Sequence, residues 1–188
     1  MKNLICCWKT AANDLLRKLS RSTLLIVFIS LGNSGWAQSA LEPVQVERGG
    51  SWLSGLYMNQ YSRRPLCAME TGLADGSVFR INYYGLRNVF LEVTWGQRIA
   101  QGSFETELTF ASDKRPALTL PTFVEANFMV VEMNDDSVAG ELLQIIARAQ
   151  ALTVMNRTTP LFKVPVNGSA KALEIFFTCV RALGRHQP

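Results

Sequence analysis

The stretch Phe104-Glu105-Thr106-Glu107-Leu108-Thr109-Phe110 alternates between two kinds of side chain. Its two phenylalanines and Leu108 share one face of an extended chain, because side chains two residues apart point the same way. Glu105 and Glu107 fall on the opposite face. The stretch therefore predicts a strand with one buried side and one solvated side.

Segments of the same kind recur along the chain and are separated by turn signals such as Asp75-Gly76. They cover residues 52–57, 66–70, 78–84, 88–95, 117–120, 123–133, 152–155 and 161–164. Strands at this regular spacing favour an antiparallel sandwich or barrel.

Two helices interrupt the strand pattern. Apolar side chains recur at helical spacing in residues 135–151 and again from Ser169 to Gly184, where glycine is a natural stop. We therefore expect a mainly β protein of the α+β class, with an antiparallel sandwich-like sheet and a C-terminal helix packed on it.

The N-terminal segment has the order of an export signal. Five basic residues precede an apolar run at Thr23–Leu31, and Gly35 and Ala37 follow at −3 and −1 of a cleavage point. This order predicts a secretory signal peptide at residues 1–37 and a periplasmic or secreted location. The run of about nine residues is about half of what a membrane-spanning helix needs, so we expect no stable span in the mature chain. Retention of the segment as an anchor is the alternative to cleavage.

Charge is distributed unevenly between the signal and the rest of the chain. The whole sequence has 19 basic and 15 acidic residues, but residues 1–37 hold five of the basic residues and one of the acidic ones. The remainder therefore has no net charge. A neutral chain without basic clusters lacks the electrostatic footprint of a nucleic-acid-binding protein, so we expect no nucleic acid partner.

The remaining chain has the usual size of one domain. Residues 38–50 are polar and end in Gly49-Gly50, which predicts a flexible lead-in. A single β-rich domain is then expected at residues 51–188.

Cys67 and Cys179 are the two cysteines that follow the signal. In an oxidising compartment, a disulfide between them is the first expectation. Two buried free thiols, or pairing with another chain, are the alternatives. Cys179 falls on the side of the expected C-terminal helix that carries Phe176 and Val180, so the bridge would attach this helix to the sheet.

The residues of the common catalytic mechanisms are sparse. The one histidine, His186, lies at the chain end, which is a poor position for the imidazole that serine and cysteine hydrolases need. Two sulfurs and a terminal imidazole do not make a metal site, so we expect neither a metal nor another cofactor. Glu105 and Glu107 are the carboxylate pair that a glycosidase-like enzyme could use, although their alternation predicts a solvated face.

A candidate binding patch comes from aromatic and basic residues. Tyr83 and Tyr84 point to opposite faces of the expected strand, so one of them is expected on the surface. Tyr84 and Arg87, with Arg63 and Arg64 of a preceding turn, form the candidate patch.

The segment Val164–Cys179 has a Pro-apolar-x-Gly turn followed by a helix that contains Ala172-Leu173. It resembles the C-terminal stretch of small exported bacterial proteins of the invasion-associated locus B type. That family tends to carry more cysteines than the two that follow residue 37 here. The resemblance implies a periplasmic or secreted protein linked to host interaction, with no catalytic residue to carry over.

These observations together predict an exported, non-enzymatic binding or accessory protein. Its expected partner is another protein of the bacterial envelope or secretion apparatus. An immunity or inhibitor protein that blocks a secreted enzyme is one alternative, and a carboxylate-based hydrolase is another.

Overall fold

The computed structural model describes residues 41–85 and 89–185. The strands in this part of the chain are β1 (Leu41–Gly49), β2 (Trp52–Asn59), β3 (Pro65–Gly72), β4 (Val78–Tyr83), β5 (Val89–Thr94), β6 (Phe104–Ser112), β7 (Leu118–Glu125), β8 (Phe128–Met133), β9 (Leu152–Asn156) and β10 (Thr159–Val164). The helices are α2 (Asp136–Arg148) and α3 (Ser169–Gly184). The predicted signal peptide, Arg87 and His186 lie outside the described residues.

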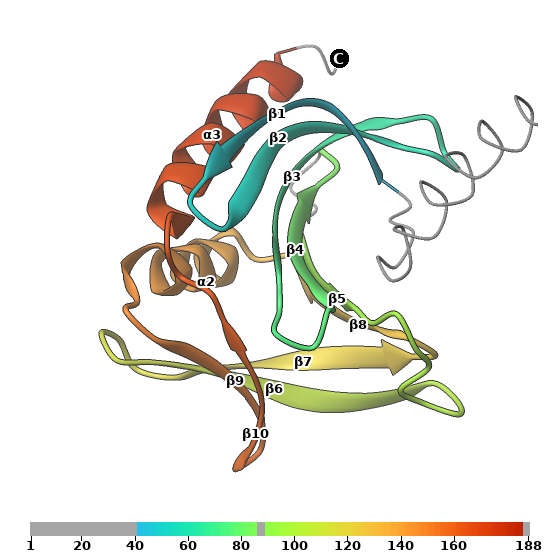
Figure 1. Cartoon of the computed structure of the whole chain (residues 1–188), viewed down its shortest axis with the longest axis vertical. Coiled ribbons are helices and arrows are strands. Elements are labelled where there is room, and N and C mark those ends of the chain that lie inside the picture. Colours follow the sequence, from blue (N-terminus) through green and yellow to red (C-terminus); the bar gives the residue numbers. More distant parts are fainter. Residues whose placement is uncertain (1–40, 86–88, 186–188) are drawn as a thin grey trace, which may run out of the picture. The chain divides into compact units, whose positions relative to one another are not determined.

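The strands form one continuous sheet in the order β1-β2-β3-β4-β5-β8-β7-β6-β9-β10, and every described neighbour is antiparallel. Consecutive hairpins build the β1–β5 half. The pairing of β5 with β8 then joins this half to the β6–β8 hairpins (Figure 1). The predicted fold class is confirmed: a mainly β chain with an antiparallel sheet and a C-terminal helix packed on it.

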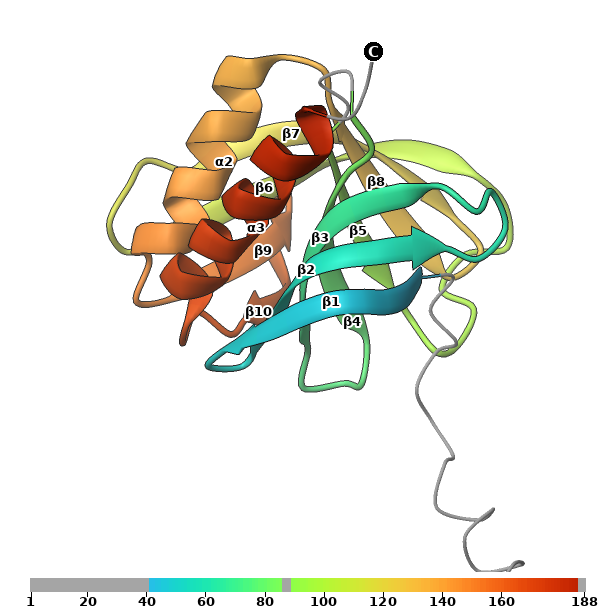
Figure 2. The ribbon, with the colours of Figure 1, turned by 90° about the horizontal axis from the view of Figure 1, so that it is seen from above.

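Both helices pack on the same face of the sheet, and they lie side by side there (Figure 2). Helix α2 begins at Asp136, next to the predicted start at residue 135. The Asp135 carboxylate caps it by accepting hydrogen bonds from the backbone N–H and the hydroxyl of Ser137, at 2.7 and 2.6 Å. Its buried stripe includes Leu142 and Ile146. Helix α3 contributes Phe176, whose burial is worth roughly 2 kcal/mol. The helices thus close the main apolar core over the sheet.

The predicted flexible lead-in at 38–50 is wrong for the described part of that range. Residues 41–49 form the edge strand β1, which pairs with β2 from Leu41 to Gly49. Its polar composition misleads because an edge strand is half-solvated and natural sheets place charged side chains there. Gly49 and Gly50 lie where the chain turns from β1 into β2, and Gly50 has a φ of +60°.

The prediction of one strand over 123–133 is also wrong. The chain reverses at Ala126-Asn127, so that Glu125 pairs with Phe128 across a hairpin. Ala126 adopts φ 48°, a conformation for which alanine gives no sequence signal. It is held there because the Ala126 carbonyl accepts hydrogen bonds from the N–H groups of Ile99 and Ala100, at 2.7 and 2.9 Å.

Candidate functional site

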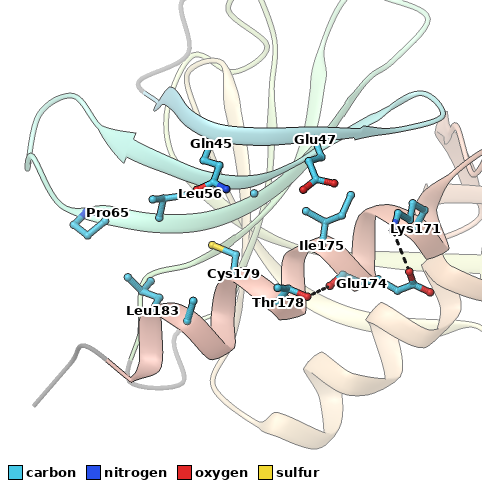
Figure 3. Close-up of a pocket in the computed structure, with 12 residues that line it drawn as sticks. Gln45, Glu47, Leu56, Pro65, Lys171, Glu174, Ile175, Thr178, Cys179 and Leu183 are labelled. Atoms are coloured by element: carbon cyan, nitrogen blue, oxygen red, sulfur yellow. Dashed lines mark hydrogen bonds and ion pairs between the residues drawn. The ribbon is translucent and has the colours of Figure 1, made fainter.

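A groove of about 610 Å³ runs between helix α3 and the face formed by strands β1, β2 and the start of β3 (Figure 3). Its lining comes from segments that are far apart in the sequence: Gln45, Glu47, Gly55, Leu56, Pro65, Lys171, Glu174, Ile175, Thr178, Cys179, Ala182 and Leu183. This volume lies within the range of binding sites for small ligands or peptide segments.

Helix α3 supplies one wall of the groove through a single stripe of side chains. The stripe starts at Lys171 and continues at intervals of three and one residues to Leu183, the spacing that places side chains on one face of a helix. A neighbouring face of α3 carries Ala172 and Phe176 into the core. The helix is therefore fixed by one face while another stays open to the groove.

The opposite wall depends on a β-bulge in β1. Pro43 pairs with Tyr57, but Gln45 pairs with Leu56, so Val44 is an extra residue. Because an extra residue exchanges the two faces of a strand, Gln45 and Glu47 point toward α3 instead of away from it (Figure 3). Gly55 at φ +147° makes the bulge possible, since a Cβ there would overlap the Gln45 carbonyl oxygen.

The lining combines an apolar floor with a polar rim. Leu56, Ile175 and Leu183 are half-buried and give the floor its apolar character. Among the rim charges, Lys171 Nζ lies 3.5 Å from Glu174 Oε2. The exposed Glu47 carboxylate on the opposite wall makes no ion pair within the described residues. The lining therefore carries one uncompensated negative charge.

The predicted disulfide is confirmed, and it borders this groove. Cys67 on β3 is bonded to Cys179 on α3, with a Cα–Cα distance of 5.8 Å. The bond ties the helix directly to the sheet, and Cys179 is part of the lining (Figure 3). The spacing between the two groove walls is therefore covalently restrained.

The predicted patch of Tyr84, Arg63, Arg64 and Arg87 does not line the groove. Arg63 and Arg64 are exposed in the β2–β3 turn, while Arg87 lies outside the described residues. Tyr84 is half-buried rather than exposed, and its ring packs edge-on against Phe90 at 5.8 Å between centroids. Burial raises the pKa of the Tyr84 hydroxyl. The expectation that Tyr83 or Tyr84 lies on the surface is wrong, because Tyr83 is half-buried against the main core.

Tyr84 and the arginine-bearing turn are nevertheless neighbours. The Asn59 side chain at the end of β2 lies close enough to the Tyr84 hydroxyl to lower its pKa, against the larger effect of burial. The Asn59 carboxamide oxygen accepts hydrogen bonds from the N–H groups of Tyr61 and Ser62, at 3.0 and 2.9 Å. Asn59 thus lies close to Tyr84 and holds the base of the turn that carries Arg63 and Arg64.

Glu105 and Glu107 are exposed on β6, on the face opposite the core, as their alternation predicts. They line neither the groove nor the shallow depression beside the β9–β10 turn. Residues 41–85 and 89–185 contain no cluster of three or more potential metal ligands.

The groove was not predicted from the sequence. The available signal was helix α3, where the apolar Ile175 lies outside the stripe of side chains that packs on the main core. When the apolar surface of a helix is wider than the face that packs on the core, the remaining apolar side chains are available to contact something else. The bulge in β1 that completes the site has a single sign in the sequence, the glycine at position 55.

Comparison of the chain with family models, characterised proteins and solved structures finds no match. Within the described residues, no helix has the length and apolar character needed to cross a membrane. The disulfide indicates an oxidising, extracytoplasmic environment.

Proposed function

We propose that this chain is an exported, non-enzymatic binding protein that acts as an accessory factor in the bacterial envelope or a secretion system. The groove between α3 and β1–β3 carries the proposal. It combines a half-buried apolar floor with a polar rim, which is the composition of a recognition site. Its two walls are joined by the Cys67–Cys179 bond, so the site is formed before a partner arrives.

Export is supported by two further observations. Residues 1–37 have the charge and hydropathy order of a signal peptide. The resemblance of residues 164–179 to invasion-associated locus B proteins points to the periplasm or the cell exterior and to a link with host interaction. Both agree with a domain that holds a disulfide.

Site-specific photocrosslinking tests the binding function. A photoreactive amino acid is placed at Gln45 or Thr178, on the two groove walls, in the full chain expressed in a bacterium with an oxidising periplasm. Glu107 on the exposed face of β6 provides the matched control position. We expect the same envelope protein, identified by mass spectrometry, to crosslink from both groove positions and not from Glu107. Equal crosslinking from all three positions, or none from the groove, would refute the function.

An inhibitor or immunity function is the second candidate, and the β2–β3 turn favours it. Tyr61 in this turn is 86% exposed and stands beside the exposed Arg63 and Arg64. Protruding aromatic and arginine side chains are typical anchors of an inhibitory loop. This function requires a stoichiometric complex with a secreted hydrolase that Tyr61→Ala abolishes, whereas a complex lost only with groove variants supports the first proposal.

A further inference from the structure

The dimensions of the groove restrict what can occupy it. The α3 stripe from Lys171 to Leu183 extends about 18 Å at 1.5 Å per residue. A peptide in extended conformation advances about 3.3 Å per residue, so five or six residues would span that distance. The length of the groove therefore suits a short extended segment that lies along α3.

The rim chemistry favours a peptide over a hydrocarbon chain. Gln45 and Glu47 on one wall carry hydrogen-bonding groups that are exposed in the open groove. On the other wall, the Thr178 hydroxyl donates to the Glu174 carbonyl at 2.9 Å and accepts from Arg181 Nη2 at 3.1 Å, which leaves it one lone pair for a further hydrogen bond. An extended peptide has unpaired backbone N–H and C=O groups that these side chains can satisfy. An acyl chain would cover the same groups without giving them partners, which is unfavourable.

The charge of the groove determines which charge on a ligand it favours. Glu47 and Glu174 face the groove from opposite walls, and Lys171 compensates Glu174 at 3.5 Å. Glu47 stands above Ile175 without a cation within the described residues (Figure 3). A lysine or arginine on the ligand would complete this pair, while a carboxylate would be repelled.

We infer that the groove binds an extended segment of a partner protein, with apolar side chains on the Leu56–Ile175–Leu183 floor and a lysine or arginine at Glu47. The inference rests on the proposed function and specifies the chemistry of the partner. The segment has five or six residues in contact, and its backbone lies along the flank of α3.

Selection from a phage-displayed library of random twelve-residue peptides, on the intact disulfide-bonded protein, tests this chemistry. We expect the selected peptides to share a lysine or arginine flanked by apolar residues. The affinity of one such synthetic peptide should fall about tenfold for Glu47→Lys and about threefold for Glu47→Gln, and should weaken as salt increases. Glu107→Lys, the same charge reversal on an exposed strand position away from the groove, should leave the affinity unchanged.

Several results would overturn the inference. They are selection of acidic peptides, selection of no peptide, an affinity that ignores both Glu47 variants, and one-to-one binding of laurate that displaces the peptide. The crosslinking experiment separates this failure from failure of the function. If a partner crosslinks at Gln45 and Thr178 through an acidic or helical segment, the binding function stands and the inference about its ligand is wrong.

Discussion

Arg80 on β4 and Glu70 on β3 form an ion pair on the face of the sheet opposite the helices. Arg80 Nη2 lies 2.6 Å from Glu70 Oε2, and Arg80 Nε donates a hydrogen bond to the same oxygen at 2.7 Å. The two residues are in register, and their side chains are 5% and 19% exposed. Tyr57 lies beside them, and burial raises the pKa of its hydroxyl above the ordinary value, followed by a smaller effect of the Glu70 charge.

Removal of the carboxylate should destabilise the protein strongly. Glu70→Gln removes the negative charge that lies 2.6 Å from the buried Arg80 guanidinium, and we expect a loss of about 2 kcal/mol in the free energy of unfolding. Glu125→Gln, at an exposed position on β7, is the matched control and should change stability by less than about 0.5 kcal/mol. Urea unfolding measures both. Equal effects of the two substitutions would show that the pair contributes nothing to the sheet.

Asp113 should make stability depend on pH. Its carboxylate accepts hydrogen bonds from the N–H groups of Ala151 and Gln150, at 3.1 and 2.8 Å, and these hold its pKa below the ordinary value. A lowered pKa in the folded state means that the stabilisation is complete above the unfolded-state pKa and is lost as pH falls through the folded-state pKa.

Urea unfolding of the wild type and of Asp113→Asn, compared as a function of pH, checks this prediction. We expect the variant to be less stable above about pH 5 and the difference to shrink steadily below about pH 4, toward zero at the acid end. Glu105→Gln, at an exposed position on the preceding strand β6, is the control for the loss of a surface carboxylate. A constant gap between wild type and Asp113→Asn at every pH would contradict the assignment.

The parts of the fold that sequence predicts are those where local chemistry and tertiary structure agree. Strands such as β6 were predictable because alternation reports a sheet with one buried face. The start of α2 was predictable because Asp135 has the side chain of a helix cap. The Ala126-Asn127 reversal was not, because distant N–H groups of Ile99 and Ala100 hold it in place.

The candidate site was predictable only in part, for a related reason. The Cys67–Cys179 pair follows from the count of cysteines after the signal and the compartment. The groove depends on the bulge at Val44, which Gly55 on the neighbouring strand permits, and on where α3 packs against the sheet. The placement of α3 is set by contacts between residues more than 100 positions apart, such as the Trp52 Nε1–H that donates to the Pro165 carbonyl at 2.8 Å. No local pattern reports them.

The disulfide should contribute a large share of the stability. It joins residues 112 positions apart, and closing a loop of that length restricts the unfolded chain by about 4–5 kcal/mol in the chain-entropy model. We expect a double Cys67→Ala/Cys179→Ala variant to lose a comparable free energy of unfolding. A reducing agent should destabilise the wild type similarly and leave the double variant unchanged. Mass analysis that finds two free thiols in the exported protein would contradict the bond.

Gly168 should tolerate no side chain, because it joins the start of α3 to the β1–β2 turn. It has φ +82°, and a Cβ there would overlap the backbone of Gly49 and Gly50. The Ser51 N–H donates to the neighbouring Asn167 carbonyl at 3.1 Å, so a shift at this junction would also disturb the groove wall formed by β1. Gly168→Ala should therefore cost more than about 2 kcal/mol, from strain and overlap together.

The matched control is Gly140→Ala in the middle of α2, where an added Cβ meets no atom within 4 Å. There the substitution should stabilise the protein by roughly 0.5–1 kcal/mol, because alanine loses less conformational freedom than glycine in a helix. Thermal unfolding of the two variants should thus shift the midpoint in opposite directions. If both shifts had the same sign, the close approach of Gly168 to Gly49 could not be what positions α3 against β1, and the covalent tie at Cys179 would have to do so alone.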